Sequence, residues 1–469
     1  MAAGFEPGSF RDPHGRVLLA PDGVYRALSE TGLADWRALQ ESGLAAELAD
    51  EGRLVATELA SDADAQRIAG ELPEAPAGVL RHERIPFVSY AYEWSFAMLK
   101  AAALLQLELT ERALDKGLIL KDATPYNVQF LGSRPVFIDV SSFERLREGE
   151  PWAGYRQFCM LFLYPLMLGA YRGVDFQPLL RGSIDGIPPS QMAALMKGSR
   201  LSKGVLSHVR LHARLEASSA ERAGSEVRGE LKQAKFSTEL IRSNVKRLRK
   251  LIQSLDWKAG RSAWSEYRDE NTYSDDDDRA KAEFVRARTA ESRSSLIWDL
   301  GANDGAYSRI AAENADCVLA LDFDHATIDG LYRRLAADGD ERILPLVGNL
   351  VDPSPGLGWR GAERRPLEGR GHPDLVLALA LVHHLSLTGN VPVAELLDWF
   401  ASLGSPAVIE FPTRHDPMVK RLLAAKADGL HADYELGEFE RLLGQRFEID
   451  RREQLPSGSR VLFAVHPRA

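Results

Sequence analysis

Residues 296–310, LIWDLGANDGAYSRI, join an apolar run to a glycine-bearing turn and a helix-like segment. This order is typical of a strand, a tight turn and a helix that hold a nucleotide. A dinucleotide turn requires G-x-G-x-x-G, but the corresponding positions here are Gly301, Asn303 and Ala306. A P-loop requires a lysine after its last glycine, and none follows Gly305. The pattern therefore favours a nucleoside ligand that needs close backbone approach without a phosphate cradle.

Polar residues follow the next two strand-like runs. Asp322 ends the second run, and a carboxylate there can accept hydrogen bonds from both ribose hydroxyls, as it would for NAD. Asn349 follows the third run and could pair with an adenine edge through its amide. S-adenosylmethionine is a nucleoside ligand of the required kind.

Methyl transfer to a hydroxyl or amine requires an aligned nucleophile and removal of a proton. His383 and His384 follow the fourth strand-like run and are the first candidates for a general base, because imidazole titrates near neutral pH. Glu410, after the fifth run, is the second candidate. These three residues could also bind a metal ion, but their spacing does not require one, and we expect none.

Four segments in order, DLGANDG, LDFD, VGN and LALVHHL, resemble class I S-adenosylmethionine-dependent methyltransferases over roughly residues 260–469. The resemblance implies that Asp299, Gly301 and Gly305 line the methionine end of the cofactor, Asp322 the ribose and Asn349 the adenine. The family usually has glycine where Asn303 stands and aspartate where Asn349 stands.

Segments 264–274, 353–367, 377–385 and 409–423 resemble a bacterial group of nodulation-type methyltransferases. That similarity implies that Trp264, Tyr267, Tyr273 and Lys281 lie on the lid side of the cofactor, with Tyr273 among the cofactor-binding residues. Aromatic packing of a helical cap is the alternative interpretation of these side chains.

The N-terminal region contains LILKDATPYNVQFLGSRPVFIDV, in which Asp139 follows Asp122 and Asn127. In phosphotransferases an aspartate orients the acceptor hydroxyl, while an asparagine and a second aspartate hold magnesium. The pattern resembles aminoglycoside-phosphotransferase-like kinases over roughly residues 15–200.

The departures from that pattern favour an inactive, pseudokinase-like domain. No lysine precedes Lys100, although such kinases pair a strand lysine with the phosphates, and no glycine-rich loop covers a triphosphate. Arg53 or another arginine could substitute for the lysine. The domain would bind a nucleotide such as Mg-ATP, bind the substrate, or present the acceptor.

Composition indicates a globular protein, with 45% hydrophobic and 27% charged residues among 469. A net charge of −9 argues against generic binding of nucleic acid or anionic membrane. Two distant cysteines and the absence of a secretory signal pattern favour a cytoplasmic location. The apolar run 158–171 is too short to span a bilayer and reads as a buried helix.

We expect an α/β protein of three regions. Residues 1–200 form an α+β kinase-like domain, residues 201–290 a helical linker or cap, and residues 291–469 a Rossmann-like methyltransferase sheet. The tail, FEIDRREQL and SRVLFAVHP around a Pro-Ser-Gly turn, predicts a closing antiparallel hairpin.

The segment 236–255 predicts an amphipathic helix. Its apolar positions at helical spacing are Phe236, Leu240, Ile241, Val245, Leu248, Leu251, Ile252 and Leu255. Its other face carries Arg242, Lys246, Arg247, Arg249 and Lys250. This face is either solvated or a patch for RNA or a phosphate-bearing substrate.

The leading hypothesis is a methyltransferase acting on an oxygen or nitrogen nucleophile, with a kinase-like domain that recognises the acceptor. The alternatives are a Mg-ATP-dependent phosphotransferase and a non-catalytic nucleotide-binding scaffold. The acceptor is open among a glycan or lipo-oligosaccharide, a small metabolite, a protein side chain and RNA, and the oligomeric state is open too.

Overall fold

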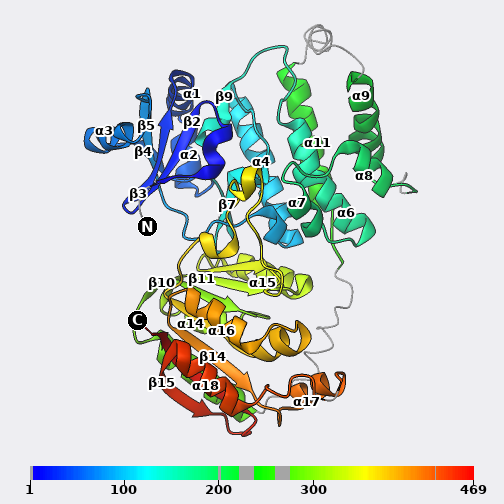
Figure 1. Cartoon of the computed structure of the whole chain (residues 1–469). Coiled ribbons are helices and arrows are strands. Elements are labelled where there is room, and N and C mark those ends of the chain that lie inside the picture. Colours follow the sequence, from blue (N-terminus) through cyan, green and yellow to red (C-terminus); the bar gives the residue numbers. More distant parts are fainter. Residues whose placement is uncertain (1–3, 199–201, 221–236, 259–274, 428, 469) are drawn as a thin grey trace.

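The computed structural model describes residues 4–198, 202–220, 237–258, 275–427 and 429–468. Figure 1 shows the chain as two halves, with the N-terminal elements above the C-terminal sheet. Among the residues within these ranges, no helix is long and apolar enough to cross a membrane.

The C-terminal half is built on a seven-stranded sheet in the order β12-β11-β10-β13-β14-β16-β15. The first five strands in this order are parallel, β16 is antiparallel to β14, and β15 is antiparallel to β16. The strands are β10 (Ser294–Leu300), β11 (Ala315–Asp322), β12 (Ile343–Val347), β13 (Leu375–Ala378), β14 (Ala407–Pro412), β15 (Phe447–Gln454) and β16 (Arg460–Pro467). The expected Rossmann-like parallel strands and closing hairpin are therefore observed.

One face of this sheet packs against helices that follow or precede its own strands. Ile297, Val318 and Ala320 share a core with side chains from α13, α14 and α15. These helices are α13 (Asp275–Thr289), α14 (Ala306–Ala311) and α15 (His325–Asp338). The alternation along β10 sends Leu296, Trp298 and Leu300 to the opposite face, because successive side chains of a strand point to opposite sides.

The opposite face is covered partly by the N-terminal half. It also packs on α16 (Val393–Ser402) and α18 (Leu436–Arg446), with α17 (Pro417–Ala424) near the end of β14. Residues 348–374, between β12 and β13, contain only short 3-10 turns at Trp359–Gly361 and Leu367–Gly369. The Trp298 ring on this face packs edge-on against Phe87 at 6.1 Å, so a single hydrophobic core joins both halves.

The N-terminal half begins with an antiparallel sheet in the order β1-β2-β3-β5-β4. Its strands are β1 (Gly4–Phe5), β2 (Gly15–Ala20), β3 (Gly23–Leu28), β4 (Thr57–Leu59) and β5 (Gly78–His82). The helices between them are α1 (Glu30–Glu41), α2 (Leu44–Asp50) and α3 (Asp62–Gly70). Tyr25 and Ala27 of β3 pack with Ile68 of α3 in a small separate core.

The long helix α4 (Phe96–Asp115) links this sheet to two strand pairs, β6 (Leu118–Leu120) with β9 (Phe143–Arg145) and β7 (Val128–Leu131) with β8 (Arg134–Phe137). Helical segments follow. They are α5 (Tyr155–Phe158), the π-helical turn Cys159–Leu163, α6 (Tyr164–Arg172), α7 (Gln177–Gly182), α8 (Pro189–Leu195), the π-helical turn Val205–Arg210, α9 (Leu211–Ala220) and α11 (Thr238–Ser254). The apolar run 158–171 is helical and mostly buried, as expected.

The amphipathic helix expected near residue 245 is α11, which packs along α4. Ile241, Val245, Leu248, Leu251 and Ile252 are buried as expected. Leu240, in the first turn of α11, was expected on the apolar face but is 51% exposed. Phe236 lies outside the described residues.

The basic face of α11 is partly neutralised by carboxylates of α4. Arg242 pairs with Asp115, and Lys246 and Arg249 both lie within ion-pair distance of Glu111, at 3.6 and 3.2 Å. These ion pairs neutralise part of the positive charge that the sequence suggested as a binding patch for a polyanion.

Two buried polar contacts connect the N-terminal half to the C-terminal half. Glu93 and Arg370 form a bidentate ion pair with N–O distances of 2.6 and 2.5 Å, and both side chains are at most 2% exposed. Asp329 of α15 accepts a hydrogen bond at 2.7 Å from the backbone N–H of Ala97, in the first turn of α4. A carboxylate at a helix N-terminus is favourable, since the first N–H groups of a helix lack intrahelical partners.

Candidate functional site

The turn after β10 is held in a conformation that favours glycine. Gly301 and Gly305 both have φ of +79°, and Asn303 has φ of +48°, which asparagine tolerates better than most residues. A Cβ on Gly305 would approach Leu331 Cδ1 to 2.8 Å, so the turn also packs closely on α15. Asn303 therefore adopts a left-handed backbone in this turn without being a glycine.

Asp322, at the carboxyl end of β11, fastens this turn. Its two carboxylate oxygens accept hydrogen bonds from the backbone N–H groups of Asn303 and Asp324, each at 2.9 Å. Burial raises the pKa of Asp322, and these N–H groups oppose that rise. Each oxygen keeps acceptor capacity, because a carboxylate oxygen has two lone pairs.

Asp299 lies at the end of β10, beneath the turn. It is 2% exposed, and the hydroxyl of Ser308 donates to its Oδ2 at 2.5 Å. Burial raises the pKa of Asp299 to about 6, although the Ser308 hydroxyl and the charge of Lys281 act in the other direction. Its carboxyl group thus takes up and releases a proton close to neutral pH.

Asn349 lies on the loop after β12 and is exposed. Its side-chain oxygen accepts a hydrogen bond from the Val351 backbone N–H at 3.0 Å. The carboxyl ends of β10, β11 and β12 thus place Gly301, Asp322 and Asn349 along one edge of the sheet, which is where ligands bind in open α/β sheets.

The two histidines follow a strained residue at the end of β13. Ala380 has φ of +51°, and the rings of His383 and His384 lie 4.0 Å apart. His383 is fully buried and its two ring nitrogens have no hydrogen-bond partner among the described residues. Burial lowers the pKa of His383 well below its usual value. His384 is only partly buried, and burial together with Arg460 lowers its pKa to about 4.

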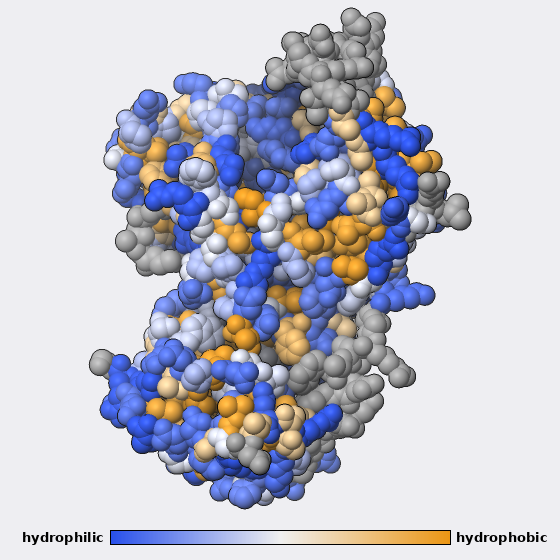
Figure 2. Space-filling view, turned by 45° about the vertical axis from the view of Figure 1, so that its right-hand side comes forward, coloured by the Kyte–Doolittle hydropathy of each residue, from blue (hydrophilic) through white to orange (hydrophobic). Residues whose placement is uncertain are grey.

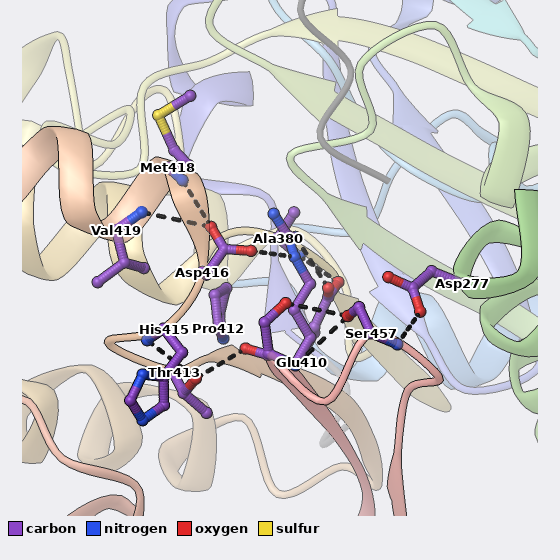
Figure 3. Close-up of polar contacts among 12 residues, drawn as sticks. Asp277, Ala380, Glu410, Pro412, Thr413, His415, Asp416, Met418, Val419 and Ser457 are labelled. Atoms are coloured by element: carbon purple, nitrogen blue, oxygen red, sulfur yellow. Dashed lines mark hydrogen bonds and ion pairs between the residues drawn. The ribbon is translucent and has the colours of Figure 1, made fainter. Parts of the chain in front are cut away.

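Glu410, expected as an alternative base, is instead the centre of a buried ion-pair network (Figure 3). Its oxygens contact Lys281 Nζ at 2.7 Å and Arg460 Nη1 at 3.0 Å, and it accepts the Ala380 backbone N–H at 2.8 Å. Burial favours a raised pKa, but Lys281 and Arg460 outweigh it and lower the pKa of Glu410 to about 2. A carboxylate with so low a pKa, already bound to two cations and a backbone N–H, is a poor proton acceptor near neutral pH.

The network extends beyond Glu410. Arg460 also contacts Asp416 at 2.7 Å, and Asp416 accepts the backbone N–H groups of Met418 and Val419 at the start of α17. Figure 3 shows Asp277 on the other side, where it accepts the Ser457 N–H of the closing hairpin at 2.8 Å. Sequence reasoning missed Arg460 and Asp416, whose roles depend on contacts across the sheet.

Of the four residues expected on the lid side, only Lys281 is described. Its side chain is 3% exposed and its ammonium lies 4.6 Å from the centre of the Tyr307 ring. Trp264, Tyr267 and Tyr273 lie outside the described residues. Among the residues that the structure describes, no group of three or more histidine, cysteine, aspartate or glutamate side chains is arranged to hold a metal ion.

The N-terminal half reaches the same edge of the sheet. His325, three residues after Asp322, lies 3.6 Å from Asp175, and Asp352 on the loop after β12 pairs with Arg181 at 2.8 Å. Val174, Phe323 and Val351 in these loops are 44–47% exposed. Figure 2 shows apolar surface at the level where the halves meet.

The expected residues of the kinase-like site are brought together by the two strand pairs. Asp122 follows β6 and Asp139 follows β8, and burial and the charge of Asp139 raise the pKa of Asp122. Asn127 donates to the Ser142 hydroxyl at 2.9 Å. Arg53, proposed as a substitute for the missing lysine, contacts Glu108 instead, and the arginine that reaches Asp139 is Arg26 of β3.

No protein-family model matches the chain. A curated relative, the nodulation protein NoeA of Rhizobium meliloti (strain 1021), is 34% identical over 459 residues, covering 97% of this chain and 94% of that protein. The chain belongs to the NoeA family. The segments expected to resemble nodulation-type proteins thus reflect a relationship that extends along nearly the whole chain.

Two solved structures that resemble part of this NoeA-family chain are methyltransferases. The N-methyltransferase NodS from Bradyrhizobium japonicum WM9, in complex with S-adenosyl-L-homocysteine, is 12% identical, with 44% of this chain and 98% of that chain covered and a TM-score of 0.31. Magnesium protoporphyrin IX methyltransferase ChlM from Synechocystis PCC 6803, also with S-adenosyl-L-homocysteine bound, is 16% identical, with 44% of this chain and 95% of that chain covered and a TM-score of 0.30.

Proposed function

We propose that this protein is an S-adenosylmethionine-dependent methyltransferase that acts on an oxygen or nitrogen nucleophile. The observation that carries the proposal is the contact of Asp322 with the Asn303 N–H, which joins an acidic strand end to a left-handed turn at the switch point of the sheet. The glycine-bearing turn favours close backbone approach of a ligand, and Asp322 provides a carboxylate for vicinal hydroxyls, without a phosphate cradle.

Each residue of the edge has a proposed role. Asp322 accepts hydrogen bonds from the ribose hydroxyls, and the amide of Asn349 meets the adenine. Asp299 faces the cationic amino end of the methionine, and Gly301 and Gly305 allow the backbone to approach. The near-neutral pKa of Asp299 supports its role, since a cationic ligand would stabilise the ionised carboxylate.

The base is assigned to His384 in preference to His383 and Glu410. His384 is partly buried beside the fully buried His383, so its ring can contact an acceptor at the edge of the sheet. Burial lowers its pKa to about 4, so the imidazole is unprotonated across the physiological range, and its basicity, although weakened, exceeds that of Glu410. His383 packs behind it at 4.0 Å.

The N-terminal half, which we propose to be a pseudokinase-like domain, assists acceptor recognition. The supporting observation is its contribution to the rim of the edge through the Asp175–His325 and Arg181–Asp352 contacts. The relative's name connects that protein with nodulation. We infer that the acceptor belongs to the same process in bacteria that carry this family.

Calorimetric titration of the full-length protein with S-adenosylmethionine tests the proposal. Asp322→Ala and Asp322→Asn should each weaken binding at least about tenfold, because a hydrogen bond to a charged group contributes about 1.5–3 kcal/mol. Asp316→Ala is the matched control, since Asp316 lies on the same strand but pairs at the surface with Arg293. The assignment would be refuted if the wild-type protein bound Mg-ATP but showed no heat of binding with S-adenosylmethionine.

A further inference from the structure

Two carboxylates of the N-terminal half, Asp12 and Asp139, lie against one arginine, and a third, Asp122, is near them. Asp139 lies 2.9 Å from Arg26 Nη1 and Asp12 lies 3.6 Å from the same nitrogen. Asp122 is close enough to Asp139 and Asp12 for both charges to raise its pKa. Magnesium sites for phosphoryl transfer are built from carboxylate and amide oxygens. The question is therefore whether this carboxylate cluster could bind a divalent cation.

Arg26 is held in this position by the sheet that carries it. Its neighbours on β3, Tyr25 and Ala27, pack into the small core against α3, so the alternation of the strand sends Arg26 to the opposite face. The side chain is 9% exposed, and its Nη1 also donates to the Ser141 hydroxyl at 2.9 Å. The guanidinium is therefore a fixed part of the cluster.

Asp139 pairs with Arg26, and each of its oxygens accepts a hydrogen bond from a serine hydroxyl. The hydroxyls of Ser141 and Ser142 donate to its Oδ1 and Oδ2 at 2.7 and 2.6 Å. Burial works toward a raised pKa, yet Arg26 and the two serines leave the pKa of Asp139 lowered. Asn127 reaches Asp139 only through Ser142, to which its amide donates.

The other groups that face Arg26 are compatible with a permanent positive charge there. His82 lies on the neighbouring strand β5 and is 7% exposed. Burial and the charge of Arg26 lower the pKa of His82 to about 3, so this imidazole stays neutral. Lys121 is the second cation near the cluster, and its charge lowers the pKa of both Asp122 and Asp139.

These carboxylates do not fit a divalent cation. A cation at Asp139 would lie within a few ångströms of the guanidinium and would compete with two serine hydroxyls for the carboxylate oxygens. We propose that Arg26 is a built-in cation that takes the place of the metal ion at Asp139, so that the N-terminal half works without a divalent metal and does not transfer phosphate from Mg-ATP. The proposal is independent of the methyltransferase assignment.

The test measures Mn²⁺ binding to the full-length protein by electron paramagnetic resonance of the free ion. Wild-type protein should bind no Mn²⁺ that depends on Asp139. Arg26→Gln should bind one Mn²⁺ at least tenfold more tightly than wild type, and Arg26→Gln/Asp139→Asn should lose it. Arg81→Gln, which removes an exposed arginine of β5 that pairs with Glu58, is the matched control and should behave as wild type.

Arg26→Met keeps the packing of the stem and serves as a second neutral variant if the glutamine variant fails to fold. Mn²⁺ binding by the wild type that is lost in Asp139→Asn would overturn the proposal, as would a folded neutral variant that binds no more Mn²⁺ than wild type. Arg26→Gln should bind S-adenosylmethionine as the wild type does. Failure of this proposal can therefore be told apart from failure of the methyltransferase proposal, which Asp322→Ala tests.

Discussion

Glu410 accepts a hydrogen bond at 2.8 Å from the backbone N–H of Ala380, across the carboxyl ends of the neighbouring strands β13 and β14. Ala380 has a left-handed backbone and stands three residues before His383. The carboxylate therefore fixes the path of the chain that presents both histidines, while Lys281 and Arg460 compensate its charge.

Glu410→Gln should strongly destabilise the fold. The amide can still accept the Ala380 N–H, but Lys281 and Arg460 each lose a buried negative partner, although Arg460 keeps Asp416, and breaking a buried ion pair costs about 3–5 kcal/mol. The free energy of unfolding, from denaturant titration, measures this loss. Glu438→Gln breaks an exposed pair with Arg441 and should cost far less, because water screens such pairs. Equal losses in the two variants would contradict the structural role of Glu410.

Gly305→Ala should cost more than the backbone conformation alone explains. A left-handed residue other than glycine costs roughly 1–2 kcal/mol, and the new Cβ would also meet Leu331 at 2.8 Å. Gly339→Ala isolates the first effect, because Gly339 has φ of +67° and a Cβ there meets nothing within 4 Å. The free energy of unfolding should fall further in Gly305→Ala, and the turn should bind S-adenosylmethionine more weakly.

Asp299 should make stability fall as pH rises from about 4 to about 6. Its pKa in the folded protein, about 6, exceeds the ordinary aspartate value of 3.8, so the native state binds this proton more tightly than the unfolded state. The stabilisation is complete below pH 4 and is lost by about pH 6, an effect of about 3 kcal/mol. Asp299→Asn should remove this slope in pH-dependent unfolding, whereas Asp316→Asn should keep it.

Arg370→Met should weaken the junction of the halves by about 3–5 kcal/mol, because it leaves Glu93 buried without its partner. Adding Glu93→Leu should restore much of that stability, since replacing both partners by apolar groups is often neutral. Arg134→Met removes an exposed pair across the same junction, with Glu341, and should cost less than about 1 kcal/mol. Thermal unfolding of the wild type, the two single variants and the double variant measures these differences. A double variant as unstable as Arg370→Met would contradict this account.

His384→Gln should lower kcat for methyl transfer by about 10²–10⁴, the usual contribution of general base catalysis, without changing the affinity for the methyl donor. The pKa of His384 is lowered to about 4, so the base form persists in the wild type down to about pH 4 and the rate should not fall through the usual histidine range. A rate that falls with an apparent pKa near 6.5 would argue against this residue as the base.

Much of the C-terminal half was predictable because its determinants are local. Each of its five parallel strands is a short apolar run ended by a loop or helix, and a proline, a serine and a glycine mark the hairpin turn. The turn with Gly301 and Gly305, and the position of Asp322 at a strand end, follow from the same local order. A parallel sheet places successive carboxyl ends at one edge, so these residues meet without further information.

Only the tertiary structure decided which charges compensate one another. Arg26 meets Asp139 across 113 residues of chain, and Glu410 meets Lys281 and Arg460 from three separate elements. Spacing along the sequence contains no signal for such pairs, because they depend on which strands lie side by side. The burial of Trp298 against Phe87 also depends on tertiary structure. The connection between β12 and β13 contains no α-helix, and the N-terminal half covers part of the sheet face on which Trp298 lies. Local patterns thus determined the elements and the cofactor edge, whereas long-range packing determined the protonation states and the union of the two halves.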